Sequence, residues 1–120
     1  TNVAEALRFA DDIRVSDREI FMALFLNARS SVIALDTISI GTLTASLVHP
    51  REVFKGAILF NAAAIILMHN HPSGDCSPSN EDKSTTRRLK QAGEMMGIPV
   101  LDHIIVAPGQ HYSFKENGVL

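Results

Sequence analysis

The sequence predicts an α/β fold, a mixed β-sheet flanked by helices. Apolar runs of strand length alternate with segments of helical periodicity, in the order α-β-β-β-α-β-α-β-β. Strands within hairpin distance of each other, combined with strands separated by helices, are typical of a mixed sheet. The 120 residues, 46% hydrophobic and 20% charged, have the length and composition of one globular domain over residues 1–120.

The first third of the chain predicts a helix followed by two strands. Asn2 is expected to cap a short amphipathic helix that ends at Asp11 and Asp12. Its apolar residues recur at helical spacing: Val3, Ala6, Leu7 and Ala10. Residues 19–28, EIFMALFLNA, are almost continuously apolar, which favours a strand buried on both faces. Residues 30–40 follow within hairpin distance and are expected to pair with that strand in antiparallel orientation.

The middle of the chain predicts a helix that leads into a buried strand. Residues 42–48 are expected to form either a third short strand or the entry to a helix. Pro50 suits the first helical position, and residues 51–61 continue the helix. Its broad apolar surface consists of Val53, Phe54, Ala57, Ile58 and Phe60. Residues 62–68, AAAIILM, form a short apolar run that indicates a buried strand.

The last third predicts a long helix and a hairpin. The helix is expected from about Ser79 to Met96 and stops at Gly97, since glycine is the usual residue just beyond a helix. Residues 99–108 are predicted to be a strand, and residues 111–116 return after the turn PGQ to complete a hairpin.

Two histidines stand at the exit of the predicted strand 62–68. His69 and His71 are two residues apart, so on a strand they face the same side. The linker 72–79, PSGDCSPS, is expected to reverse the chain and bring the following helix back over the strand end, with Asp82 in its first turn. Two nitrogens and one carboxylate oxygen leave a fourth position for water, which is typical of a catalytic zinc site that activates water for hydrolysis.

Structural explanations exist for some of the same residues. Ser79 and Asp82 also fit the helix-capping pattern S-x-x-[DE], and an isolated H-x-H arises easily by chance. His103, next to Asp102 in a predicted strand, is expected to be buried and hydrogen-bonded, or to contact a metal ligand from behind. Cys76 lies in a turn without a helix start that would activate a thiol, which disfavours a cysteine nucleophile. A single cysteine also excludes the deaminase zinc motif P-C-x-x-C.

The spacing His69-x-His71, seven residues, Ser79, two residues and Asp82 matches H-x-H-x7-S-x2-D, the JAMM motif of JAB/MPN metalloproteases. With LVHPREVFK and AAAIILMHNHPSG, and LDHIIV further on, the chain resembles the bacterial RadC family over residues 17–119. The resemblance implies a JAB/MPN fold similar to that of cytidine deaminases, with one Zn²⁺ per chain held by the two histidines and the aspartate. It also implies hydrolysis of peptide or isopeptide bonds. RadC proteins often carry a helix-hairpin-helix region in front of this domain; this chain lacks it and is expected to be part of a longer protein.

The resemblance also assigns roles outside the ligand set. JAMM enzymes use an upstream glutamate as general base and then acid. Glu19 opens the first long predicted strand, as the family glutamate does, and is preferred to Glu52, which lies in the first turn of a helix where a carboxylate complements the dipole. Ser79 matches the serine that stabilises an oxyanion. Asn70 and Ser73 are expected to form loop hydrogen bonds near the metal.

Charge and hydropathy limit the partners. With a net charge of −2, the chain offers little general attraction to phosphates, so only weak DNA binding is expected. The basic residues of the long helix are expected to form a solvated face: Lys83, Arg87, Arg88 and Lys90. The longest apolar run is too short to span a bilayer, and no signal peptide is visible. One cysteine is compatible with a reducing compartment, so a bacterial cytoplasmic location is expected.

Two functions of different classes remain. The first is a zinc metallopeptidase or isopeptidase that acts on a peptide or protein substrate. The alternative is a metal-binding JAB-fold interaction module, associated with DNA repair or recombination, without peptidase activity. A set of residues that includes a general base favours the enzyme, because a scaffold needs none. A homo-oligomer is compatible with either function.

Overall fold

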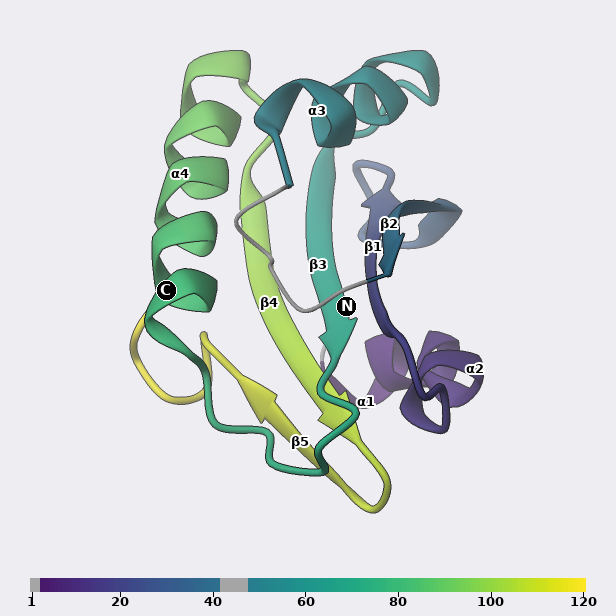
Figure 1. Ribbon diagram of the computed structural model, residues 1–120. Helices are drawn as coiled ribbons and strands as arrows, with labels where there is room; N and C mark the ends of the chain where they lie inside the picture. The colour runs from purple at the N-terminus through teal and green to yellow at the C-terminus, as the bar shows by residue number, and fades with distance from the viewer. Residues whose placement is uncertain (1–2, 42–47) are drawn as a thin grey trace.

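The computed structural model describes residues 3–41 and 48–120 and shows one five-stranded sheet with helices on both faces (Figure 1). The strands are β1 (Glu19–Leu26), β2 (Val32–Gly41), β3 (Ala64–Asn70), β4 (Val100–Ala107) and β5 (Gln110–Ser113), in the spatial order β2-β1-β3-β4-β5. Only β3 and β4 pair in parallel; the other neighbours are antiparallel. The predicted mixed sheet flanked by helices is therefore confirmed, as is the β1–β2 hairpin.

The helices are α1 (Val3–Ala6), the 3₁₀ helix η1 (Leu7–Phe9), α2 (Asp11–Arg14), α3 (Pro50–Leu59) and α4 (Asn80–Met96). The prediction of a single first helix that ends at Asp11 and Asp12 is wrong. The chain turns at the fully buried Ala10, and the two aspartates open α2, where carboxylates complement the amino-terminal end of the helix dipole. The predicted cap at Asn2 lies outside the described residues, as do residues 42–47 of the element predicted at 42–48.

Two apolar layers hold the helices against the sheet. Because side chains alternate along a strand, Phe21, Ala23 and Phe25 of β1 pack with α3 and α4, whereas Met22 and Leu24 pack with α1 and α2. This arrangement confirms the prediction that β1 is buried on both faces. The face that carries α3 and α4 is the one that leads to the site described below.

The remaining elements agree with their predicted positions to within a few residues. The start and end of α4 follow the sequence signals, with Ser79 as the N-cap and Gly97 at φ 70° just beyond the last turn. Strand β3 extends past the predicted 62–68 to Asn70, so His69 is part of the strand.

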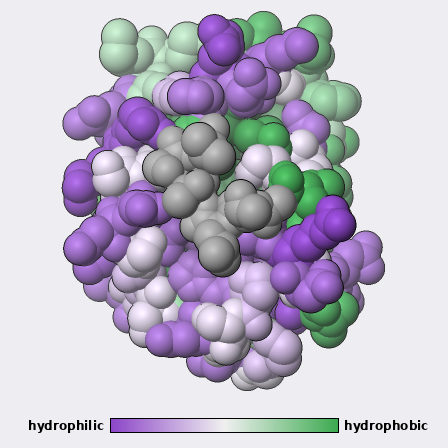
Figure 2. Space-filling view, viewed as in Figure 1, coloured by the Kyte–Doolittle hydropathy of each residue, from purple (hydrophilic) through white to green (hydrophobic). Residues whose placement is uncertain are grey.

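Hydrophilic side chains dominate the part of the surface that Figure 2 shows outside the grey residues. Among the described residues, no helix has the length and apolar character required to cross a membrane.

Candidate metal centre

Four potential metal ligands converge where β1, β3 and α4 meet. One ligand atom from each of Glu19, His69, His71 and Asp82 lies within 4.8 Å of the other three. Strands β1 and β3 are antiparallel with Phe21 opposite His69, so the start of β1 lies beside the end of β3. The linker after His71 then returns α4 to the same place, as the sequence predicts. The side chains are 0% (His69), 3% (Asp82), 12% (Glu19) and 16% (His71) exposed, so the cluster is largely shielded from solvent.

Asp82 serves the helix start and the cluster together. The Asp82 backbone N–H donates to Ser79 Oγ at 3.0 Å, and Asp82 Oδ2 accepts from the Ser79 backbone N–H at 2.9 Å. The same carboxylate lies 3.2 Å from His69 Nε2 and 3.0 Å from His71 Nε2. Burial by itself would raise the pKa of Asp82, but the two imidazoles and the Ser79 backbone outweigh burial and hold that pKa well below its usual range. The predicted capping pair is confirmed, and it also fixes the carboxylate in the cluster.

A backbone carbonyl sets the tautomer of His71. His71 Nδ1 lies 2.8 Å from the carbonyl oxygen of Asp75, which can only accept a hydrogen bond. The proton of the neutral ring is therefore on Nδ1, and Nε2 presents its lone pair to the cluster.

A buried hydrogen-bond chain sets the tautomer of His69. The Thr86 hydroxyl donates to the carbonyl oxygen of Asp82 at 2.7 Å, so its oxygen accepts from His103 Nδ1 at 2.5 Å. His103 Nε2 must then accept, and its partner at 2.7 Å is His69 Nδ1. Complete burial lowers the pKa of His103, and the nearby His69 lowers it further, so the ring stays neutral. The chain leaves the lone pair of His69 Nε2 directed at the cluster. The prediction that His103 is buried and hydrogen-bonded is confirmed, and one of its partners is His69.

These lone pairs need a positive charge among them. His69 Nε2 and His71 Nε2 are 3.0 Å apart and share the carboxylate of Asp82, so the neutral rings and the anion repel one another unless a cation intervenes. Without a metal, a proton can take that place: the hydrogen bond with Asp82 raises the pKa of His71, against the opposing effect of burial. A buried set of two imidazoles and a carboxylate, each oriented by hydrogen bonds from outside, fits a divalent metal ion.

Glu19 lies at the edge of this set, with Oε1 3.9 Å from His69 Nε2. Burial raises the pKa of Glu19, while His69 and His71 pull it down. Glu52, the other glutamate considered, is on α3 with a 53% exposed side chain 3.8 Å from Arg51, and it does not belong to the cluster. The structure therefore brings Glu19 to the predicted ligands and leaves Glu52 outside.

Other predicted residues have structural positions. Cys76 is buried, and burial raises the pKa of its thiol, which disfavours a nucleophile further. Ser73 forms a loop hydrogen bond, accepting from the Asp75 backbone N–H at 3.4 Å. Asn70 does not lie in the loop: it ends β3 and is fully buried. The sequence pattern assigned no role to Thr86, whose approach to His103 depends on how α4 packs on β4.

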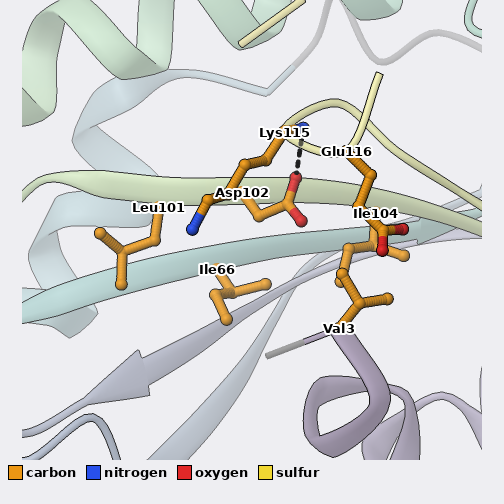
Figure 3. A pocket seen from close by; sticks show the side chains of 7 residues that line it. All are labelled: Val3, Ile66, Leu101, Asp102, Ile104, Lys115 and Glu116. Carbon is orange, nitrogen blue, oxygen red and sulfur yellow. Dashed lines mark hydrogen bonds between the residues drawn. The ribbon is translucent and has the colours of Figure 1, made fainter. Parts of the chain in front are cut away.

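A hollow of about 320 Å³ lies on the opposite face of the sheet and contains none of the four cluster residues (Figure 3). It is lined by Val3, Ile66, Leu101, Asp102, Ile104, Lys115 and Glu116. The carboxylate of Asp102 already accepts from the backbone N–H groups of His103 and Lys115 and from the Ser113 hydroxyl. Its hydrogen bonds therefore hold β4 to the C-terminal turn and do not indicate a ligand.

The mixed sheet with its flanking helices is consistent with a JAB-type domain, and the junction of β1, β3 and α4 holds a candidate metal centre. The chain belongs to the RadC-like JAB domain family, whose family model matches residues 1–119.

Three curated bacterial relatives share half or more of the aligned residues with this chain. A UPF0758 protein of Desulforamulus reducens is 56% identical over 110 residues, 92% of this chain and 48% of the relative. A UPF0758 protein of Clostridioides difficile is 51% identical over 112 residues, which are 93% of this chain and 48% of the relative. A UPF0758 protein of Symbiobacterium thermophilum is 59% identical over 102 residues, which are 85% of this chain and 44% of the relative. The chain thus spans about half the length of these relatives. Their shared name states no activity.

Proposed function

We propose that this chain is a zinc-dependent hydrolase of peptide or isopeptide bonds, in which His69, His71 and Asp82 hold one zinc ion and Glu19 is the general base. The observation that carries the proposal is the convergence of these four side chains in a cluster that is almost closed to solvent. The RadC-like JAB domain match supports it, because the JAB fold includes metalloproteases.

The donor set supports zinc over magnesium and calcium. Two imidazoles with one carboxylate are typical catalytic zinc ligands, whereas magnesium and calcium prefer oxygen donors. Two nitrogens bound to one tetrahedral zinc at about 2.0–2.1 Å are roughly 3.3–3.4 Å apart. The 3.0 Å between His69 Nε2 and His71 Nε2 is near that separation, so a small shift would admit the ion.

When bound, zinc would lower the pKa of a water molecule and polarise the substrate carbonyl. Glu19 takes a proton from the attacking water as the water oxygen bonds to the carbonyl carbon. The carboxyl group then gives that proton to the leaving amine as the C–N bond breaks. Burial suits Glu19 to both steps, because it raises the pKa of the carboxyl and so lets the group hold a proton between them.

Ser79 is proposed to stabilise the oxyanion. Its backbone N–H and its hydroxyl oxygen are both used by Asp82, which fixes the side chain at the rim of the cluster. The hydroxyl hydrogen is left to donate to the negative charge that develops on the carbonyl oxygen. Capping and oxyanion stabilisation are therefore compatible in one residue.

The test is hydrolysis of a peptide and isopeptide library by the zinc-loaded wild type, Glu19→Gln and Glu52→Gln. Glutamine keeps the size of the side chain but cannot accept the proton, so Glu19→Gln is expected to lower turnover roughly 10²-fold or more. Zinc content should stay unchanged, and Glu52→Gln should retain wild-type rates. A larger loss for Glu52→Gln than for Glu19→Gln would assign the base to Glu52.

The alternative function, a metal-binding interaction module associated with DNA repair or recombination, predicts no turnover by the wild type with any substrate of the library. The position of the Glu19 carboxylate beside the proposed ligands favours the enzyme, because an interaction module has no use for a base at that place. We propose that the substrate is a peptide or protein in the bacterial cytoplasm.

A further inference from the structure

Asn70 stands between the two histidines in sequence but faces the other way. His69 and its strand neighbours point toward α4, whereas Asn70, one residue later, points to the face of α2 and is 0% exposed. Its side-chain amide makes three hydrogen bonds, all to the backbone of the first residues of β1 and of the segment just before it. Oδ1 accepts from the Ile20 N–H at 2.6 Å, and Nδ2 donates to the carbonyl oxygens of Arg18 at 2.9 Å and Ser16 at 3.4 Å.

These bonds hold the two peptide groups on either side of Glu19. The Arg18 carbonyl belongs to the peptide before Glu19, and the Ile20 N–H belongs to the peptide after it. One rigid amide group therefore fixes the direction in which the Glu19 side chain leaves the backbone.

Among the described residues, the backbone of β3 does not pair with this end of β1. The backbone pairing of β1 with β3 ends at Phe21 opposite His69. Beyond that point Glu19 pairs only with Gly41 of β2, which is the outer strand of the sheet. The Asn70 amide extends the contact between the two strands to Ile20 and Arg18, beyond their last backbone pair.

We propose that Asn70 is a positioning residue that holds the Glu19 carboxylate beside the metal ligands, an inference that rests on the proposed role of Glu19 as the base. His69 and His71 are oriented by their own hydrogen bonds to His103 and to the Asp75 carbonyl. Loss of the Asn70 amide therefore displaces the base and leaves the ligands in place.

The kinetic test is a double-mutant cycle between Asn70→Ala and Glu19→Gln, with zinc content measured for each variant. Asn70→Ala is expected to lower kcat roughly 10- to 100-fold, because a base misplaced by about 1 Å acts poorly, while zinc content and KM stay near those of the wild type. In the Glu19→Gln background the same substitution should cost nothing further. Equal losses of turnover in both backgrounds would overturn the proposal.

Two controls separate positioning from general destabilisation. Asn27 is a matched residue at the other end of β1, where its Oδ1 accepts from the backbone N–H groups of Arg29 and Ser31 at 2.9 and 3.0 Å. Asn27→Ala should leave kcat unchanged, and a loss as large as that of Asn70→Ala would contradict the proposal. Asn70→Asp keeps the shape and the acceptor for Ile20 but replaces both donors with an oxygen that faces two carbonyl oxygens, so it separates loss of the donors from loss of the whole side chain. Urea unfolding of each variant shows whether it is folded under the assay conditions.

A second readout needs no turnover. In the wild type the Ile20 N–H should resist hydrogen exchange, and NMR order parameters should show a rigid Glu19 side chain with and without zinc. Asn70→Ala should expose the Ile20 N–H and loosen the Glu19 side chain, and Asn70→Asp should loosen Glu19 alone. A wild type that hydrolyses nothing would defeat the proposed function only. A Glu19 side chain that stays equally ordered in both variants would defeat the positioning role, whatever the activity.

Discussion

Thr86→Val tests the hydrogen-bond chain that orients His69. Valine matches threonine in shape at this buried position, so the substitution removes the hydroxyl without opening a cavity. His103 Nδ1–H then has no acceptor, and the proton of this ring can lie on either of its two nitrogens. If the proton stays on Nδ1, a buried donor is unsatisfied, which costs about 1–3 kcal/mol of folding free energy. If it moves to Nε2, it meets the Nδ1–H of His69, which must then move its own proton to Nε2.

In the second outcome a proton occupies His69 Nε2, the nitrogen that is proposed to bind the metal. Loss of such an outer partner typically lowers metal affinity about 10- to 100-fold, which corresponds to roughly 1.4–2.7 kcal/mol. Each outcome is measurable: chelator competition gives the zinc affinity, and urea unfolding of the metal-free protein gives the stability. Thr86→Ser, which retains the hydroxyl, is the control. A Thr86→Val protein with zinc affinity within about twofold and stability within about 0.5 kcal/mol of the wild type would refute the tautomer argument.

Two further predictions concern pH and nucleic acid. In the metal-free protein, the folded-state pKa of His71 is raised, mainly by its bond with Asp82, so its contribution to stability is present below its ordinary value of 6.5 and is lost as the pH rises through the folded-state pKa. Unfolding free energy, measured without zinc, should therefore fall more from pH 6 to pH 8 in the wild type than in His71→Ala, a comparison in which the effect of buried His103 is common to both proteins. Zinc affinity of the wild type should rise over the same range because the metal displaces that proton. A His71→Ala variant with the same pH dependence of stability as the wild type, or zinc affinity that falls as the pH rises, would disprove the linkage. Because the net charge is −2, fluorescence titration with duplex DNA should show only weak binding that falls further with salt, and submicromolar affinity at physiological salt would contradict this expectation.

Local sequence signals account for most of the fold, because each depends on neighbours in the chain. The capping pair Ser79 and Asp82, the stop at Gly97 and the apolar run of β1 all appear in the structure where the pattern predicts them. The break at Ala10 does not follow from spacing, because the apolar periodicity continues through it. It depends on how the short helices pack under the sheet, which is a tertiary effect.

The ligands and the residues that orient them differ in how far the sequence reveals them. His69, His71 and Asp82 lie within one strand-linker-helix unit, so their spacing alone indicates convergence. Glu19 comes from a distant strand, and only resemblance singled it out before the β1–β3 register placed it beside His69.

The supporting residues carry no sequence signal of their own. Thr86 and His103 meet because α4 packs on β4, and the amide of Asn70 finds its partners 50 to 54 positions earlier in the chain. A threonine in a helix and an asparagine in a strand have many ordinary explanations, so their roles emerge only from the packed structure.

The central claim is that the cluster is a zinc site, and elemental analysis of the purified protein tests it most directly. Protein prepared without chelator is expected to contain about one zinc per chain. His71→Ala should abolish the bound metal, whereas His111→Ala should retain it, because His111 pairs with Glu116 and does not belong to the cluster. A wild type that contains no zinc and takes up none when it is supplied, or a His71→Ala variant that still holds one zinc per chain, would contradict the account.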